Sequence, residues 1–310
     1  MVQKRGIARN IYWLGLVSFL TDISSEMIFS VFSLFITVIL GASSVILGII
    51  EGIADFSACS LDYLAGKLSD ESSKRKKFAL IGYAFSTLAK LMLLFANSLF
   101  VAGAFRIIER LGKSFRGPPR DAWIASMTNK ENRGLAFGIH KAFDKAGAIL
   151  GPLIAYVMLK ILGQSMVTLK LIFLVAFIPA VIAVFTLIFI KEKNEKPIPK
   201  ENIFLAFKTL SPSFKKYLLI ASFFSIAYFS YGFLLLKAYL VGFSIANVVL
   251  LYAFFNLFFV LFAVPFGKLG NMIGRKNVIK LSYLIYALLC FGLIFADKKW
   301  EVLSLFALFG

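Results

Sequence analysis

The sequence predicts an all-α polytopic membrane protein, built as two six-helix halves of which the second is incomplete. Three observations predict this fold class. The 310 residues are 60% hydrophobic and 16% charged, with a mean hydropathy of +0.85, whereas soluble domains average about 45–50% apolar and about 25% charged residues. The apolar residues gather in runs of about 20, the length that spans a bilayer. A polar motif that follows Gly66 returns after Gly267.

Nine segments are apolar and long enough to be membrane-spanning helices, and a tenth begins near Trp300. In chain order, they cover residues 11–36, 44–66, 78–96, 99–118, 135–160, 167–190, 217–240, 246–267 and 277–296.

The links between these segments alternate in charge. One set is basic: "MVQKRGIARN", "SDESSKRKK", "NKENRG", "KEKNEKPIPKEN" and "GNMIGRKN". The other set is short and mostly uncharged: "GASS", "NS", "LGQS" and "VGFS", with "ADKKW" as the exception. Because basic loops stay on the cytoplasmic side, we expect a multi-pass protein of the plasma (inner) membrane with a cytoplasmic N-terminus.

The net charge of +18 does not indicate nucleic-acid binding. The basic residues lie in short loops between apolar runs, where they set membrane topology. The expected partners are the lipid bilayer, a small-molecule solute and protons, and we expect a monomer.

The longest link divides the chain into three parts. Residues 191–216 contain Pro197, Pro199 and Pro212 and many lysines, a composition typical of a linker between bundles. The predicted parts are a six-helix half (1–190), a cytoplasmic linker (191–216) and a partial second half (217–310).

The two related polar links support this division. "GKLSDESSKRK" starts at Gly66 and "GKLGNMIGRK" starts at Gly267, 201 residues later. A second half of the same length would end at about residue 400. We therefore expect a C-terminally truncated chain that lacks the last two spans and most of the tenth.

Two six-span halves, a basic central link and this repeated motif resemble the major facilitator superfamily, whose loop signature is G-x-x-x-D-R/K-x-G-R/K-R/K. The first copy departs from it at Glu71 and Ser73, and the second at Asn271. "GAILGP", with Gly147, Gly151 and Pro152, is similar to a signature of the superfamily's antiporters.

A narrower resemblance is to an uncharacterised prokaryotic branch of facilitator permeases. It rests on "TDISSEM", "IERLGKSFRGPPRDAWIA" and "RGLAFGIHKAFDKAGAILGP". The resemblance implies alternating access, in which two halves rock around a site near the midplane. It also implies that spans one, two, four and five, with seven and eight, line the cavity, and that spans three, six and nine lie outside it.

Helical spacing places charged residues on stripes along the four spans of the first half that would line the cavity. Similar numbers of acids and bases indicate pairing, since an unpaired charge in a bilayer is costly. Depth along each span, at 1.5 Å per residue, predicts an Arg110–Asp144 pair. It also makes Arg106 and Arg110 the expected partners of Asp22 and Glu26. Lys90, on a peripheral span, could instead snorkel to the membrane surface.

Three groups of site residues follow. Candidates for solute or proton handling are Asp22, Glu26, Glu51, Asp55, Arg106, Glu109, Arg110, Asp144 and Lys145, with Tyr228, Tyr231 and Asn256 from the second half. Candidates for a cytoplasmic gate are Gly66, Asp70, Arg75, Gly267, Asn271, Gly274 and Arg275. Gly147, Gly151 and Pro152 are either packing residues or a hinge.

The function expected from these features is secondary active transport of a small solute, proton-coupled and favoured as export. Coupling would use carboxylates that take up a proton when they lose contact with water. No enzyme motif, cofactor or metal site is expected. The alternatives are a non-transporting membrane sensor or assembly protein of the same fold, and an inactive truncated fragment.

Overall fold

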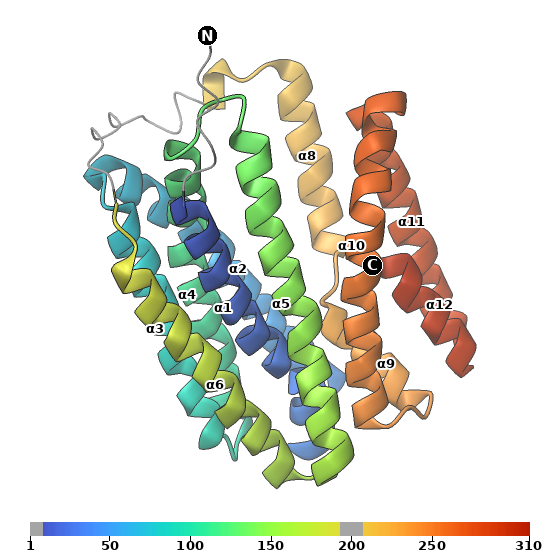
Figure 1. Ribbon diagram of the computed structural model, residues 1–310. Coiled ribbons are helices and arrows are strands. Elements are labelled where there is room, and N and C mark those ends of the chain that lie inside the picture. The colour runs from blue at the N-terminus through green and yellow to red at the C-terminus, as the bar shows by residue number, and fades with distance from the viewer. Residues whose placement is uncertain (1–8, 193–206) are drawn as a thin grey trace.

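The computed structural model describes residues 9–192 and 207–310, apart from the side chains of Asn271 and Arg275. Every regular element within these ranges is a helix, and the helices run roughly alongside one another (Figure 1). This confirms the predicted all-α fold class. The 191–216 linker lies mostly outside the described residues.

The first group of helices comprises α1 to α6. Their bounds are α1 Arg9–Leu34, continued by the π-helical stretch η1 Phe35–Ile39, then α2 Ser44–Ser72, α3 Arg75–Leu94, α4 Leu99–Ser126, α5 Arg133–Leu162 and α6 Met166–Phe189. Each of the first six predicted segments is therefore helical.

The second group comprises α8 to α12. Their bounds are α8 Pro212–Ala227, α9 Tyr231–Leu240, α10 Ile245–Ile273, α11 Arg275–Phe295 and α12 Lys299–Phe309. The predicted segment 217–240 was expected to be one helix, but it is broken between α8 and α9. At the break, the Phe229 amide donates to the Tyr286 hydroxyl at 2.8 Å, and Ser230 Oγ accepts from the Gly232 amide at 3.2 Å. These bonds satisfy backbone groups that the interruption releases.

The short uncharged links start the helices that follow them in a common way. Each of the four supplies a serine that caps the next helix: Ser43, Ser98, Ser165 and Ser244 accept from backbone amides three residues ahead, at 3.2–3.4 Å. A serine in this position satisfies one of the free amides of the first turn. The local sequence therefore fixes where these four helices begin.

Three helices extend well beyond their predicted ends. α2 continues past residue 66 to Ser72, α4 passes through Pro118 and Pro119 to Ser126, and α10 continues past residue 267 to Ile273. A β-carbon on Gly66 would lie 3.3 Å from Pro118 Cβ, so α2 and α4 pack against each other where their extensions begin. Their mutual packing supports helix where a chain in water would normally end it at proline.

Glycines set the closest helix contacts in the first group. A β-carbon on Gly147 would lie 3.1 Å from Asp22 Cβ, and one on Gly151 would lie 2.6 Å from the Ile23 carbonyl oxygen. One on Gly82 would lie 2.6 Å from the Arg116 amide nitrogen. α5 therefore lies directly on α1, and α3 lies directly on α4, as small residues permit in membrane bundles.

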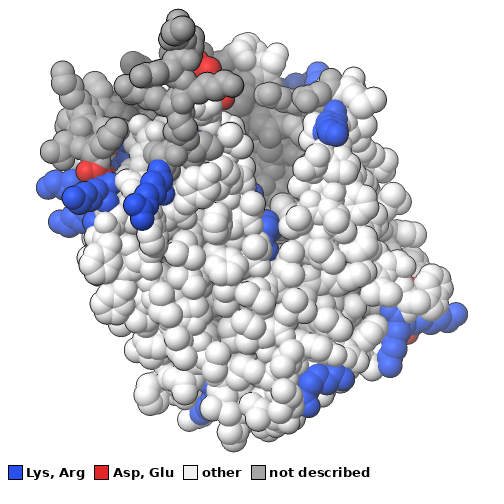
Figure 2. Space-filling model, in the orientation of Figure 1, with Lys and Arg blue, Asp and Glu red and all other residues white. Residues whose placement is uncertain are grey.

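Eight of the described helical segments are long and apolar enough to cross a membrane. α4, which the sequence also predicted to span, carries too many charges to count among them, yet it lies between α2 and α3 in the bundle (Figure 1). Charged side chains gather toward the two ends of the molecule in Figure 2, and its flank is uncharged except in the seam between the groups.

The two groups meet mainly at one end. We call the end that holds the start of α1 and the end of α6 the basic end. α8, which starts there, has no buried residue. α9, at the opposite end, buries Gly232, Leu234 and Ala238 among others. In α10, the buried residues lie before position 257, and most residues from Leu257 onward are exposed. The groups are therefore packed together at the opposite end and apart at the basic end.

Candidate functional site

A buried ion cluster joins α2 and α4. Arg106 makes two parallel hydrogen bonds to Glu51, from Nε to Oε1 at 2.8 Å and from Nη2 to Oε2 at 2.7 Å. Its Nη1 also lies 3.5 Å from Glu109 Oε2, and its guanidinium carbon lies 4.4 Å from the centre of the Phe29 ring. All three charged side chains are buried. Such a bidentate pair is among the strongest a protein interior offers.

Two acids of the first group accept hydrogen bonds from hydroxyls of the second. The Tyr252 hydroxyl on α10 donates to Glu26 Oε2 on α1 at 2.5 Å. Ser230 Oγ, at the break between α8 and α9, donates to Glu51 Oε2 at 3.3 Å. Glu26 and Glu51 therefore connect the two groups, although Arg106 was the expected partner of Glu26. That expectation was wrong because the Arg106 guanidinium is held by Glu51.

The predicted Arg110–Asp144 pair was also wrong. Arg110 Nη2 lies 3.0 Å from Asp55 Oδ1, joining α4 to α2 on a partly exposed face. The reason is packing, since α4 runs along α2 and α3 and barely touches α5. Depth alone placed Arg110 and Asp144 in one layer, but helix neighbours decide which side chains meet.

Asp144 has other partners. Its Oδ2 lies 2.6 Å from Lys141 Nζ, one turn earlier on α5, and its Oδ1 accepts from Ser18 Oγ at 2.8 Å. Asp22 lies across the α1–α5 contact from this part of α5, since a β-carbon on Gly147, three residues after Asp144, would lie 3.1 Å from Asp22 Cβ. Lys145 Nζ, one residue on, lies 3.7 Å from the centre of the Phe259 ring on α10. This side of α5 therefore faces both α1 and the second group.

Lys90 on α3 corrects a further expectation. It was expected to reach the membrane surface, but it is buried, with 1% of its surface exposed. Its Nζ donates to Ser24 Oγ at 2.6 Å and Ser25 Oγ at 3.2 Å on α1, and Ser24 in turn donates to the Ala176 carbonyl. The two serines of "TDISSEM" therefore face α3, whereas Asp22 and Glu26 on either side face α5 and α10. Two serines inside an otherwise apolar span are the sequence feature that could have predicted a buried hydrogen-bond donor such as Lys90.

The second group contributes rings. Tyr231 stacks on Tyr252 with ring centres 5.1 Å apart, and Tyr228 stacks on Tyr286 at the same distance. Tyr228 is 56% exposed. Asn256 is buried and donates to the Tyr252 carbonyl of its own helix at 3.1 Å. The stack with Tyr231 holds the Tyr252 ring, whose hydroxyl contacts Glu26.

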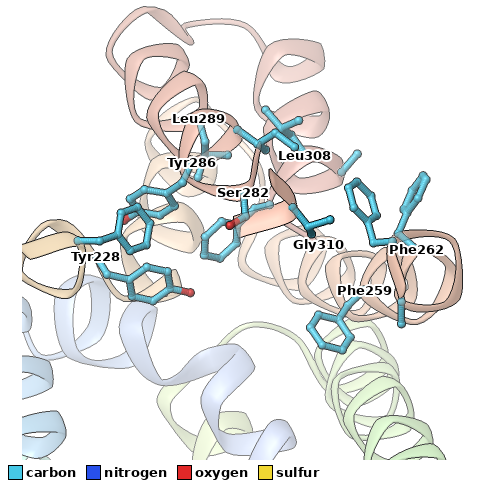
Figure 3. Close-up of a pocket in the computed structure, with 15 residues that line it drawn as sticks. Tyr228, Phe259, Phe262, Ser282, Tyr286, Leu289, Leu308 and Gly310 are labelled. Carbon is cyan, nitrogen blue, oxygen red and sulfur yellow. The ribbon is translucent and has the colours of Figure 1, made fainter. Parts of the chain in front are cut away.

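A mostly apolar cavity of about 610 Å³ lies beside these rings. Figure 3 shows Tyr228 and Tyr286 on one side of it and Phe259 and Phe262 of α10 on another, with Ser282 between. Leu308 and Gly310 form part of its lining. None of the charged residues that the sequence predicted for the site lines this cavity.

The repeated links each contain a residue with positive φ, but their backbone geometry differs in ψ, which is 25° at Ser73 and 144° at Gly274. Ser73 has φ = 52° and Gly274 has φ = 83°, and both stand at the signature's glycine position. Ser73 is the one non-glycine residue with positive φ in the described ranges. In the first link, Asp70 Oδ1 lies 3.3 Å from Arg75 Nη2. The side chains of Asn271 and Arg275, predicted for the gate, lie outside the described part of the chain, and a β-carbon at Gly267 would meet nothing within 4 Å.

Pro152 and Gly151 both lie inside α5 and are buried. Gly147 and Gly151 face α1, where the two helices come into close contact. Within the described ranges, no three His, Cys, Asp or Glu side chains are arranged to hold a metal ion.

Other proteins are similar to this chain in sequence. An uncharacterised MFS-type transporter of Methanocaldococcus jannaschii is 35% identical over 314 residues, which cover 99% of this chain and 78% of the relative. An uncharacterised Mycobacterium tuberculosis protein is 34% identical over 126 residues, or 41% of this chain and 31% of the relative. The multidrug resistance protein MdtH of Photorhabdus laumondii is 24% identical over 152 residues, or 49% of this chain and 37% of the relative.

Solved structures have the same fold at low identity. The nucleoside transporter NupG superposes with a TM-score of 0.73 at 13% identity, covering 97% of this chain and 79% of that one. A peptide transporter, POT, crystallised with sulfate, superposes with a TM-score of 0.67 at 13% identity, covering 99% and 80%. Residues 14–310 match the Major Facilitator Superfamily. This family match covers almost the whole chain, a relative aligns over 99% of the chain, and the expected helices are in place. The chain therefore belongs to the Major Facilitator Superfamily.

Proposed function

We propose that this protein is a proton-coupled secondary transporter that moves a small solute by alternating access. Membership of a superfamily of secondary transporters supports transport as the general activity. Its structural neighbours include a nucleoside transporter and peptide transporters, so their names do not select a solute for this chain.

The observation that carries the proposal is the pair of hydrogen bonds between the groups. Tyr252 donates to Glu26, and Ser230 donates to Glu51. Each acid remains attached to the first group, Glu51 through Arg106 and Glu26 through α1. Any motion that separates the two groups at this level must break both bonds. They are therefore suited to hold one state of an alternating-access cycle.

Proton coupling is supported by two acids on the facing sides of α1 and α5, Asp22 next to Gly147 of α5 and Asp144 bonded to Ser18 of α1. Two carboxylates that face each other across such a contact repel, so a shared proton stabilises the pair. Lys141 binds the far side of Asp144 at 2.6 Å and helps it to keep its charge. Asp22 is then the member that takes and releases the proton as access alternates.

The orientation follows from the loops. We propose that the basic end is cytoplasmic and that the protein lies in the plasma membrane. Since the groups are packed together at the opposite end, this conformation is then open toward the cytoplasm. The antiporter-like "GAILGP" favours export, with Gly147 and Gly151 letting α5 move on α1 without a side chain between them.

The test is solute flux in proteoliposomes. Thermal-shift screening against nucleosides, dipeptides, D-xylose, 5-aminolevulinic acid and ethidium selects the solutes to be used. Flux of each hit is then measured with and without a pH gradient, in the wild type, in Asp22→Asn and in the control Asp62→Asn. Asp62 is an exposed acid on α2.

We expect gradient-driven flux in the wild type and in Asp62→Asn, and flux without gradient dependence in Asp22→Asn. Equal responses to the gradient in Asp22→Asn and the wild type would exclude Asp22 as the coupling group. Folded protein that binds a solute but shows no flux under any gradient would favour the non-transporting sensor or assembly role.

A further inference from the structure

A second cavity lies at the basic end, between the start of α1 and the end of α6. Its volume is about 590 Å³. α1 contributes Arg9, Asn10 and Trp13, and α6 with the residues after it contributes Phe185, Phe189 and Lys191 among others. It is separate from the charged residues between the groups, and the proposed transport cycle assigns it no role.

Two cations stand at the mouth of this cavity. Arg9 and Lys191 are exposed and come from different parts of the chain. Within the described residues, no carboxylate lies within ion-pair distance of either. The Asn10 side-chain amide donates to the Lys191 carbonyl at 3.0 Å, which joins the start of α1 to the backbone after α6, and both cations line the one cavity. Glu192, the next residue, is directed away, since its Oε1 accepts from the Lys76 amide at 3.0 Å.

The rest of the cavity is apolar. Ile182, Phe185 and Phe189 repeat at helical spacing along α6 and are 48%, 59% and 81% exposed. Trp13, 40% exposed, lies across from them on α1, with the Arg9 guanidinium 6.0 Å from the centre of its ring. Tryptophan beside a cation at one end of a spanning helix is typical of the membrane–water interface.

We propose that this cavity binds an anionic glycerophospholipid from the leaflet at the basic end. The phosphate would lie between Arg9 and Lys191, and an acyl chain would lie along Ile182, Phe185 and Phe189. Two positive groups above an apolar strip match the charge and the shape of such a lipid. A free phosphate would leave the apolar strip unused, and a neutral lipid would leave both cations without a counter-charge.

The experiment measures lipid retention by native mass spectrometry. The full chain is purified in detergent and supplied with phosphatidylglycerol or phosphatidylcholine of the same acyl composition. The test variant is Arg9→Gln with Lys191→Gln. The matched control is Lys130→Gln with Lys280→Gln, which removes two exposed basic side chains from other basic-end elements. Phe185→Ala with Phe189→Ala tests the acyl strip, and thermal unfolding checks that every variant is folded.

We expect the wild type and the control to retain phosphatidylglycerol in preference to phosphatidylcholine. The Arg9/Lys191 variant should bind phosphatidylglycerol about thirtyfold more weakly, given a roughly fivefold contribution from each basic side chain near an anionic surface. The Phe185/Phe189 variant should lose affinity for both lipids.

Three results would overturn the proposal. Equal retention of phosphatidylglycerol by the Arg9/Lys191 variant and its control would show that these two side chains do not bind the headgroup. Equal binding of phosphatidylglycerol and phosphatidylcholine by the wild type would show that the cavity does not select an anionic lipid. Full displacement of the lipid by millimolar inorganic phosphate, with no effect of the Phe185/Phe189 change, would assign the site to a free anion.

Discussion

The two groups of helices bury different chemistry. The first holds a closed set of charges, in which Arg106 lies between Glu51 and Glu109 with almost no exposure. The second holds stacked rings, such as Tyr228 on Tyr286 and Tyr231 on Tyr252. The groups meet where hydroxyls of the second donate to carboxylates of the first.

This difference separates two tasks. Ion pairs between helices of one group resist rearrangement, because breaking them leaves a buried charge without a partner. Hydroxyl–carboxylate bonds between groups are single contacts, and breaking one costs less. The first group is therefore suited to move as one body, and the boundary between groups is suited to open. Four predictions test this comparison, from the largest expected effect to the smallest.

Glu51→Gln tests the rigidity of the first group. It removes the carboxylate that holds Arg106 by two hydrogen bonds and leaves it only the 3.5 Å contact with Glu109; since breaking a buried pair costs about 3–5 kcal/mol, we expect a loss of about 3 kcal/mol. The measurement is the free energy of unfolding in mixed micelles, by titration with sodium dodecyl sulfate. Asp55→Asn is the control, since the Arg110–Asp55 pair is partly exposed and should contribute no more than about 1 kcal/mol. Equal losses of stability in Glu51→Gln and Asp55→Asn would show that the buried pair stabilises the first group no more than the partly exposed pair does.

The double change Ser24→Ala with Ser25→Ala tests the buried contact between α1 and α3. It removes both hydroxyls that accept from Lys90. A buried donor left without acceptors costs about 1–3 kcal/mol, and more when it is charged, so we expect a loss of about 3 kcal/mol in the same titration.

Adding Lys90→Met to that double change supplies the matched comparison. It replaces the amine with an apolar chain of similar length, and removing both partners of a buried interaction costs little. We expect the triple variant to recover most of the lost stability. If it is no more stable than the double variant, Lys90 is not the reason for the loss.

Tyr252→Phe tests the boundary between the groups. It removes the hydroxyl bonded to Glu26 and keeps the ring that stacks on Tyr231. A hydrogen bond to a charged group contributes about 1.5–3 kcal/mol. A double-mutant cycle with Glu26→Gln isolates this contribution, and spin labels on α1 and α10 report the distance between groups. We expect coupling of that size and a broader distance distribution. If the effects of Tyr252→Phe and Glu26→Gln are additive and the spin-label distances are unchanged, this bond does not hold the two groups together.

Ser73→Gly tests the repeated links. Ser73 adopts the left-handed conformation, with φ = 52° and ψ = 25°, which costs an L-residue about 1–2 kcal/mol. The glycine also loses more freedom on folding, so we expect a net gain of about 1 kcal/mol or less in the free energy of unfolding. Gly274→Ser should lower it, because φ = 83° with ψ = 144° suits glycine alone. Stabilisation by Gly274→Ser, or none by Ser73→Gly, would contradict a cost of positive φ at these positions.

The sequence by itself determined the helices and their order. Hydropathy, the serines before four helices and the alternating loop charge act over a few residues, so they can be read along one dimension. The sequence repeat after Gly66 and Gly267 is matched in the structure by a residue of positive φ at the same position of each copy, Ser73 and Gly274.

Only the tertiary structure decided which charges meet. Arg110 pairs with Asp55 and not with Asp144, Glu26 bonds to Tyr252 rather than to an arginine, and Lys90 turns inward to Ser24. Residue spacing gives the face of a helix and its depth. Pairing also depends on which helices are neighbours and how each is rotated, and glycines such as Gly147 and Gly82 set this by allowing backbones to touch. Those contacts join residues far apart in the chain, so no local pattern records them.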